Sequence, residues 1–111
     1  MSSKIIVLPE FAGEVKRLAK KYKKIKKDLQ RLSAALQENP RLGVALAGSC
    51  YKIRVANSSI PTGKRGGFRV IYYFVDENGT IYLMSIYSKT EKENVTESEI
   101  VAILESNGLI E

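Results

Sequence analysis

The sequence contains no histidine and only one cysteine among its 111 residues. Without an imidazole, the Ser-His-Asp and Cys-His nucleophilic mechanisms are excluded. A single thiol cannot form an intrachain disulfide, and without histidine a transition-metal site is not expected. Cys50 lies in a run with strand character, where a free thiol usually behaves as a small buried hydrophobe; a reactive thiol is the alternative. We therefore predict no metal and no cofactor.

Long apolar segments are also missing. Residues 1–9 lack the apolar core of a signal peptide, and no run approaches the length of a membrane span. We expect a cytoplasmic protein with no membrane partner.

Acidic residues are too few to balance the basic ones. The chain has 18 Lys and Arg against 12 Asp and Glu, a net charge of +6. Such a balance favours polyanionic partners, chiefly nucleic acid. With 44% hydrophobic residues the chain is not a disordered tail. Its length predicts one domain over residues 1–111.

The first half predicts a strand followed by helix. Residues 5–8 form a short apolar run that ends at Pro9. Apolar residues then recur at helical spacing, in alternating steps of four and three: Phe11, Val15, Leu18, Tyr22, Ile25, Leu29, Leu32 and Leu36. This stripe fits one long helix or two helices folded back on each other. Compactness favours the hairpin, because a lone helix would leave its stripe uncovered. Pro40 ends the helical region.

The second half predicts strands and a final helix. After a loop over residues 41–49, the β-branched and aromatic runs predict strands at 51–56, 68–75 and 81–87. Asp76–Gly79 is a hairpin turn, since Asn-Gly suits positive φ.

The last helix is expected to begin near Asn94 or Thr96. Thr96 with Glu99 would form a capping box, and Asn94 with Glu97 is the rival start. Gly108 is suited to the residue after the helix end.

The alternation of side chains along the predicted strands places several cations on one face of the sheet. Because side chains alternate along a strand, Lys52, Arg54, Arg69 and Tyr73 should converge on the open face of the sheet, opposite the apolar set that meets the helices. The end of the last strand adds Tyr87 and Lys89. Cations with aromatic rings suit RNA, since bases stack while phosphates find charge. The alternative is that these residues only keep an exposed face soluble.

Lys64, Arg65, Gly66 and Gly67 precede the third predicted strand. Adjacent glycines permit close backbone approach to a ligand, and the flanking cations suit phosphate. The sequence lacks the P-loop pattern. The alternative is that the glycines are hairpin turn or bulge devices.

A second group of cations lies in the helical region. By default it is a solvated face opposite the apolar stripe, and the alternative is a contact with ribosomal RNA. The face is too polar for membrane insertion, although electrostatic attraction to anionic lipid stays open. The group comprises Lys16, Arg17, Lys20, Lys21, Lys23, Lys24, Lys26, Lys27 and Arg31.

Several segments together resemble the RelE/HigB-like toxins of type II toxin–antitoxin systems. They are residues 51–57, 63–74 and 81–92, with the Asn-Pro-x-x-Gly of 39–43. The resemblance implies a RelE/ParE-like α+β fold: a small, mainly antiparallel four-stranded sheet packed on an N-terminal helical hairpin, with a C-terminal helix. It also implies a helix break near Lys23–Lys26.

The resemblance further implies an mRNA interferase with a cognate antitoxin. Such toxins cut mRNA in the ribosomal A site without metal, when the ribose 2′-hydroxyl attacks the adjacent phosphate. Four cations match basic positions of the family: Lys52, Arg54, Arg69 and Lys89. Thr90 stands where RelE has a second basic residue.

No tyrosine follows Tyr87, although RelE has a catalytic one near its C-terminus. Tyr73 or Tyr87 is the substitute that we expect.

In this hypothesis Arg54 and Arg69 hold the phosphate by forked hydrogen bonds. Lys64 and Arg65 would anchor the RNA backbone. Lys52 or Lys89 would be the general base, because clustered cations favour loss of a neighbouring ammonium's proton. Three alternatives stay open: a ParE-like DNA gyrase inhibitor, a catalytically silent RNA- or ribosome-binding module, and an interaction protein that assembles by a helix pair.

Overall fold

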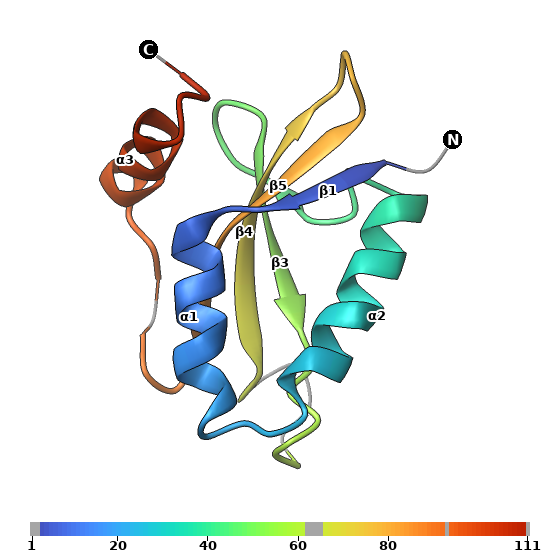
Figure 1. The fold of residues 1–111 in the computed structure, drawn as a ribbon, viewed down its shortest axis with the longest axis vertical. Helices are drawn as coiled ribbons and strands as arrows, with labels where there is room; N and C mark the ends of the chain where they lie inside the picture. Colours follow the sequence, from blue (N-terminus) through green and yellow to red (C-terminus); the bar gives the residue numbers. More distant parts are fainter. Residues whose placement is uncertain (1–2, 62–65, 93, 111) are drawn as a thin grey trace.

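The computed structural model describes residues 3–61, 66–92 and 94–110, which form one five-stranded sheet with helices on both faces (Figure 1). The elements are β1 (Lys4–Val7), α1 (Pro9–Ala19), α2 (Ile25–Glu38), β2 (Val44–Ala45), β3 (Cys50–Val55), β4 (Phe68–Val75), β5 (Thr80–Ser88) and α3 (Glu97–Ser106). The strand order is β1-β5-β4-β3-β2; β1 is parallel to β5, and the other pairs are antiparallel. The predicted α+β class and mainly antiparallel sheet are confirmed.

The predicted count of four strands was one short. The segment 41–49, expected to be a loop, contains β2, which pairs with β3 through Val44 opposite Lys52 and Ala45 opposite Tyr51. Both residues of β2 are exposed. Two exposed residues give no alternation of apolar and polar side chains, so no periodic signal exists to detect.

The helical region is two helices, which confirms the predicted hairpin, and the alternative of one long helix was wrong. The chain turns at Lys20–Lys24, which overlaps the break implied near Lys23–Lys26. A continuous helix over residues 9–38 would be about 45 Å long. The molecule's longest dimension is 38 Å, so such a helix would extend beyond the sheet and leave part of its apolar stripe uncovered. None of the helices in the described ranges has the length and apolarity needed to cross a bilayer.

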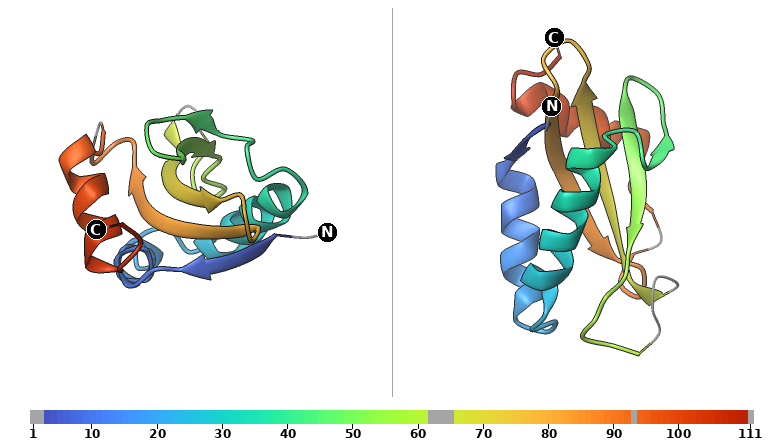
Figure 2. Two further views of the ribbon diagram at one scale, coloured as in Figure 1. Left: turned by 90° about the horizontal axis from the view of Figure 1, so that it is seen from above. Right: turned by 90° about the vertical axis from the view of Figure 1, so that its right-hand side faces the viewer.

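The main core lies between α1, α2 and one face of the sheet, with both helices on the same side (Figure 2). The helical stripe supplies buried Phe11, Leu18, Ile25, Leu32 and Leu36. The predicted inward set of β4 meets it: Phe68, Val70, Tyr72 and Phe74 are all in this cluster. The period-2 alternation of β4 therefore identified its core face correctly.

A second apolar cluster lies on the opposite face, beneath α3. It includes Cys50, Ile71, Met84 and Leu104. The prediction that this face is open was wrong for the part that α3 covers. Burial raises the pKa of the Cys50 thiol to about 11, which supports the inert interpretation of this residue.

The start of α3 is set by Thr96. Its side chain accepts from the Glu99 backbone N–H at 3.2 Å, and the Glu99 carboxylate accepts from the Thr96 N–H at 3.3 Å. The predicted capping box is confirmed, and the rival start at Asn94 was wrong. Gly108, with φ +68°, follows the helix as predicted.

Candidate functional site

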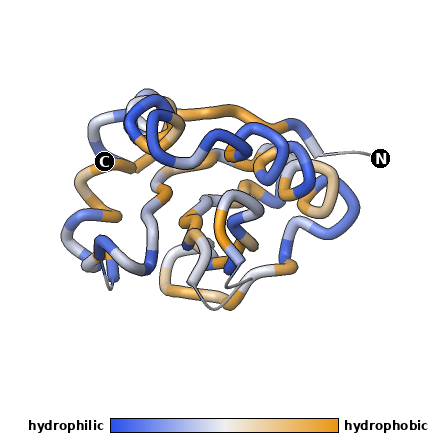
Figure 3. Tube along the Cα trace, turned by 90° about the horizontal axis from the view of Figure 1, so that it is seen from below, coloured by the Kyte–Doolittle hydropathy of each residue, from blue (hydrophilic) through white to orange (hydrophobic). Residues whose placement is uncertain are grey.

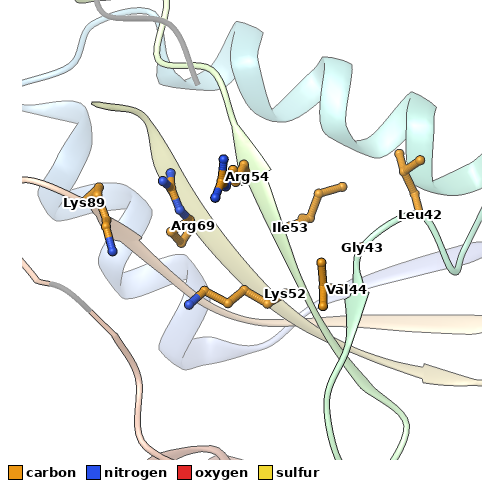
Figure 4. A pocket seen from close by; sticks show the side chains of 8 residues that line it. All are labelled: Leu42, Gly43, Val44, Lys52, Ile53, Arg54, Arg69 and Lys89. Carbon is orange, nitrogen blue, oxygen red and sulfur yellow. The ribbon is translucent and has the colours of Figure 1, made fainter. Parts of the chain in front are cut away.

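A basic groove of about 600 Å³ lies on the α3 side of the sheet (Figure 4). Its lining comes from the segment around β2, from β3, from β4 and from the end of β5. No carboxylate is among the described residues that line it: Leu42, Gly43, Val44, Lys52, Ile53, Arg54, Arg69 and Lys89. Nor does any group of three or more metal-ligating His, Cys, Asp or Glu side chains occur in the described part of the chain.

Two arginines face each other across the groove floor. Arg54 of β3 is directly opposite Arg69 of β4 in the antiparallel register, an arrangement that repels two like charges. Arg54 is exposed, whereas Arg69 is only 5% exposed and donates to the Phe68 carbonyl at 3.2 Å. Burial, and then the charge of Arg54, lower the pKa of Arg69. A bound phosphate would relieve this repulsion and accept forked hydrogen bonds from both side chains.

Two lysines complete the cationic lining. Lys52 Nζ donates to Asn94 Oδ1 at 3.0 Å. Lys89 is exposed, just beyond β5, where its backbone N–H donates to the Gly67 carbonyl at 3.1 Å. Figure 4 shows the nitrogen ends of Lys52, Arg69 and Lys89 around the same space. The fold thus brings together four of the residues that parity and resemblance selected from three separate segments.

The two predicted tyrosines do not line this groove. Tyr73 belongs to the cluster beneath α3 and stacks on Tyr82, with ring centroids 6.1 Å apart. Tyr87 is opposite Arg69 in the sheet register, but it is 4% exposed and its hydroxyl has no hydrogen-bond partner among the described residues. Burial raises the pKa of Tyr87, so at neutral pH it is a phenol that can donate a proton and not a phenolate base.

The glycine-rich loop is only partly within the described residues. Gly66 and Gly67 lead into β4, and the buried Gly67 fixes the backbone of Lys89 through its carbonyl. Lys64 and Arg65 lie outside the described residues. They stay predictions as RNA anchors.

Residues 42–44 form one rim of the groove, and they were not predicted from the sequence as part of the site. Gly43 is the key residue there, because its N–H donates to the Tyr72 hydroxyl at 3.0 Å. A Cβ at Gly43 would lie 2.9 Å from the Lys52 carbonyl oxygen and 3.1 Å from that hydroxyl. The available signal was the glycine of the Asn-Pro-x-x-Gly segment.

Replacing Gly43 with alanine is expected to destabilise the protein by about 1–3 kcal/mol, as overpacking does. Gly13→Ala is the matched control: nothing lies within 4 Å of its Cβ position in α1, so stability should rise by about 0.5–1 kcal/mol. Urea unfolding measures both. A Gly43→Ala protein as stable as the parent would mean that the rim can move aside.

The sequence of this chain matches the model of a known protein family. The sequence model of the ParE toxin of the type II toxin–antitoxin system parDE matches residues 5–93, which include β1 from its second residue, the other four strands and the four groove cations. The chain belongs to the RelE/ParE superfamily of type II toxins. The match covers the sheet and the first two helices of this toxin and ends before α3.

Solved structures share the toxin's fold at low sequence identity. A free E. coli RelE mutant with two arginines changed to alanine has a TM-score of 0.63 and 22% identity, over 92% of this chain and 97% of that one. RelE in the intact E. coli RelBE toxin–antitoxin complex has a TM-score of 0.57 and 20% identity, over 78% and 96%. The RelE mutant bound to an antitoxin RelBc peptide has a TM-score of 0.59 and 18% identity, over 92% and 93%.

Proposed function

We propose that this toxin is a ribosome-dependent mRNA endonuclease that cleaves without metal. The observation that carries the proposal is the opposed pair Arg54 and Arg69 in a groove that no described carboxylate lines. Two guanidinium groups at one place suit a phosphodiester, which carries charge on every residue of an RNA strand. Lys52 and Lys89, which also line the groove, add positive charge for the neighbouring phosphates of the RNA strand.

In the proposed reaction the ribose 2′-oxygen attacks the adjacent phosphorus. The bond between phosphorus and the 5′-oxygen breaks, which leaves a 2′,3′-cyclic phosphate and a free 5′-hydroxyl. Arg54 and Arg69 stabilise the charge that develops on the phosphoryl oxygens, and this is the dominant contribution in phosphoryl transfer. Lys52 and Lys89 are the groove's candidates for taking the 2′-hydroxyl proton and returning one to the leaving oxygen.

We also propose a cognate antitoxin as the toxin's protein partner. Two of the similar solved structures are complexes of RelE with its antitoxin or an antitoxin peptide. This toxin exposes apolar side chains around β2 and on α3, which include Val44 at 72% and Val101 at 38% exposure. Exposed apolar surface of this kind suits a protein partner. The test is co-purification with the product of an adjacent small reading frame.

A second candidate function is inhibition of DNA gyrase, because the matching family model is that of ParE toxins. The two functions separate on induction of the toxin. An mRNA endonuclease yields primer-extension stops within translated messages and no DNA breaks. A gyrase inhibitor yields DNA double-strand breaks and intact transcripts, and that result would overturn our proposal.

A further inference from the structure

The connection between α1 and α2 carries all of the toxin's excess positive charge. Residues 16–31 contain nine of the 18 Lys and Arg residues and one of the 12 Asp and Glu residues. The rest of the chain therefore has nine cations and 11 acids, a slight negative excess. We call the nine cations the basic turn: Lys16, Arg17, Lys20, Lys21, Lys23, Lys24, Lys26, Lys27 and Arg31.

The basic turn faces solvent, and among the described residues only one of its nine cations is paired with carboxylates. All nine side chains are exposed. The one acid of the segment, Asp28, is 2% exposed and accepts from the backbone N–H and hydroxyl of Ser58. Among the described residues, only Arg17 of the basic turn forms ion pairs, with Glu14 and Glu91 at 3.0 Å. Eight cations thus stay available to a partner.

Fold stability explains only part of these charges. Lys16 and Arg17 lie in the last turn of α1, where the helix dipole favours cations. The cations of α2 have no such explanation. Lys27 and Arg31 are four residues apart on α2, where like charges repel. Lys26 and Lys27 lie in the first turn of α2, where the helix dipole favours acids. A mixture of acidic and basic side chains would keep this face soluble equally well. A partner of opposite charge therefore explains better why nearly all of the charges are positive.

The chemistry of the surface favours nucleic acid over a membrane. The apolar residues of the same segment are buried in the core: Leu18 is 1% exposed, Tyr22 4%, Ile25 1% and Leu32 5%. No apolar side chain of this segment is exposed, whereas an interfacial membrane helix needs apolar side chains to insert. Seen from this end, the outer sides of α1 and α2 are hydrophilic (Figure 3).

The basic turn lies at the same end of the molecule as the arginine pair of the groove. The chain leaves β3 just beyond Arg54, and Ser59 Oγ then accepts from the Lys24 N–H at 3.0 Å. Figure 1 shows the α1–α2 connection beside this loop and the start of β4, which carries Arg69. We infer that the basic turn is a second contact for the RNA backbone, which holds the strand beyond the nucleotides in the groove. This inference rests on the proposed function.

The test is binding of a fluorescent 20-nucleotide single-stranded RNA over a range of salt concentrations. The quadruple variant Lys16→Gln, Lys20→Gln, Lys23→Gln, Lys27→Gln removes four exposed cations that form no ion pair among the described residues. If each contacts one phosphate, the slope of log K against log salt becomes about 3 units shallower. Circular dichroism checks that the variant is folded.

The matched control changes the net charge equally but elsewhere. Lys4→Glu, Gln37→Glu and Ala102→Glu, at exposed positions outside the basic turn, also lower the charge by four and should leave most of the salt dependence. The inference is overturned if the folded quadruple variant keeps the parental slope, or if the control loses as much. It is also overturned if the quadruple variant loses binding to vesicles with anionic lipid and keeps RNA binding.

This binding assay is independent of cleavage. If induced toxin leaves translated mRNA intact while the quadruple variant alone loses RNA binding, the proposed endonuclease activity fails and the second RNA contact stands. If the toxin cuts mRNA and the quadruple variant binds RNA with the parental slope, the second contact fails alone.

Discussion

Replacing Arg69 with glutamine is expected to reduce cleavage of translated mRNA roughly a hundredfold or more, in line with the loss of one oxyanion donor elsewhere. Glutamine keeps much of the side-chain volume beneath the groove and removes the charge and the forked donor. Because Arg69 faces Arg54 directly, its removal also relieves a repulsion, so the folded state should persist. Primer extension on a translated message, with toxin levels matched, measures the effect.

The control for this variant is Arg41→Gln. Arg41 is 55% exposed, pairs with Asp76 at 3.0 Å and lies outside the groove lining. It loses the same charge, yet cleavage should stay at the parental rate. Parental cleavage by a folded Arg69→Gln toxin would remove Arg69 from the proposed chemistry.

Replacing Phe11 with alanine is expected to destabilise the toxin by about 3–5 kcal/mol. Phe11 is 2% exposed and packs in the core between α1 and the sheet, so its loss removes buried apolar area and leaves a cavity. Whole domains are stable by only about 5–15 kcal/mol. The thermal midpoint should fall by roughly 10–25 °C, which differential scanning calorimetry measures.

Val101→Ala is the matched control for Phe11→Ala. It also removes apolar atoms from a helix, but Val101 is 38% exposed on α3. Its effect should stay within about 0.5 kcal/mol. Equal midpoints for the two variants would mean that the α1 core has little role in stability.

The candidate site was predictable in part, and the part that failed has one cause. Alternation along β3 and β4 placed Lys52, Arg54 and Arg69 on the same face, because the period of a strand is local. The same reasoning put Tyr73 with them. Tyr73 is on that face, but α3 covers its end of the sheet. The sequence of a strand does not indicate whether a helix about thirty residues away will cover it.

The sequence by itself determined the helical segments, the strands β1, β3, β4 and β5, the two residues that could cap α3, and which side of β4 faces the core. These follow from periodicity, turn chemistry and hydrogen bonds between near neighbours. Only the tertiary structure decided that α1 and α2 separate at Lys20–Lys24, that β2 extends the sheet, and that Arg69 is buried opposite Arg54. Strand register, burial and the space left to a helix depend on contacts between distant segments, and packing sets them for the whole chain at once.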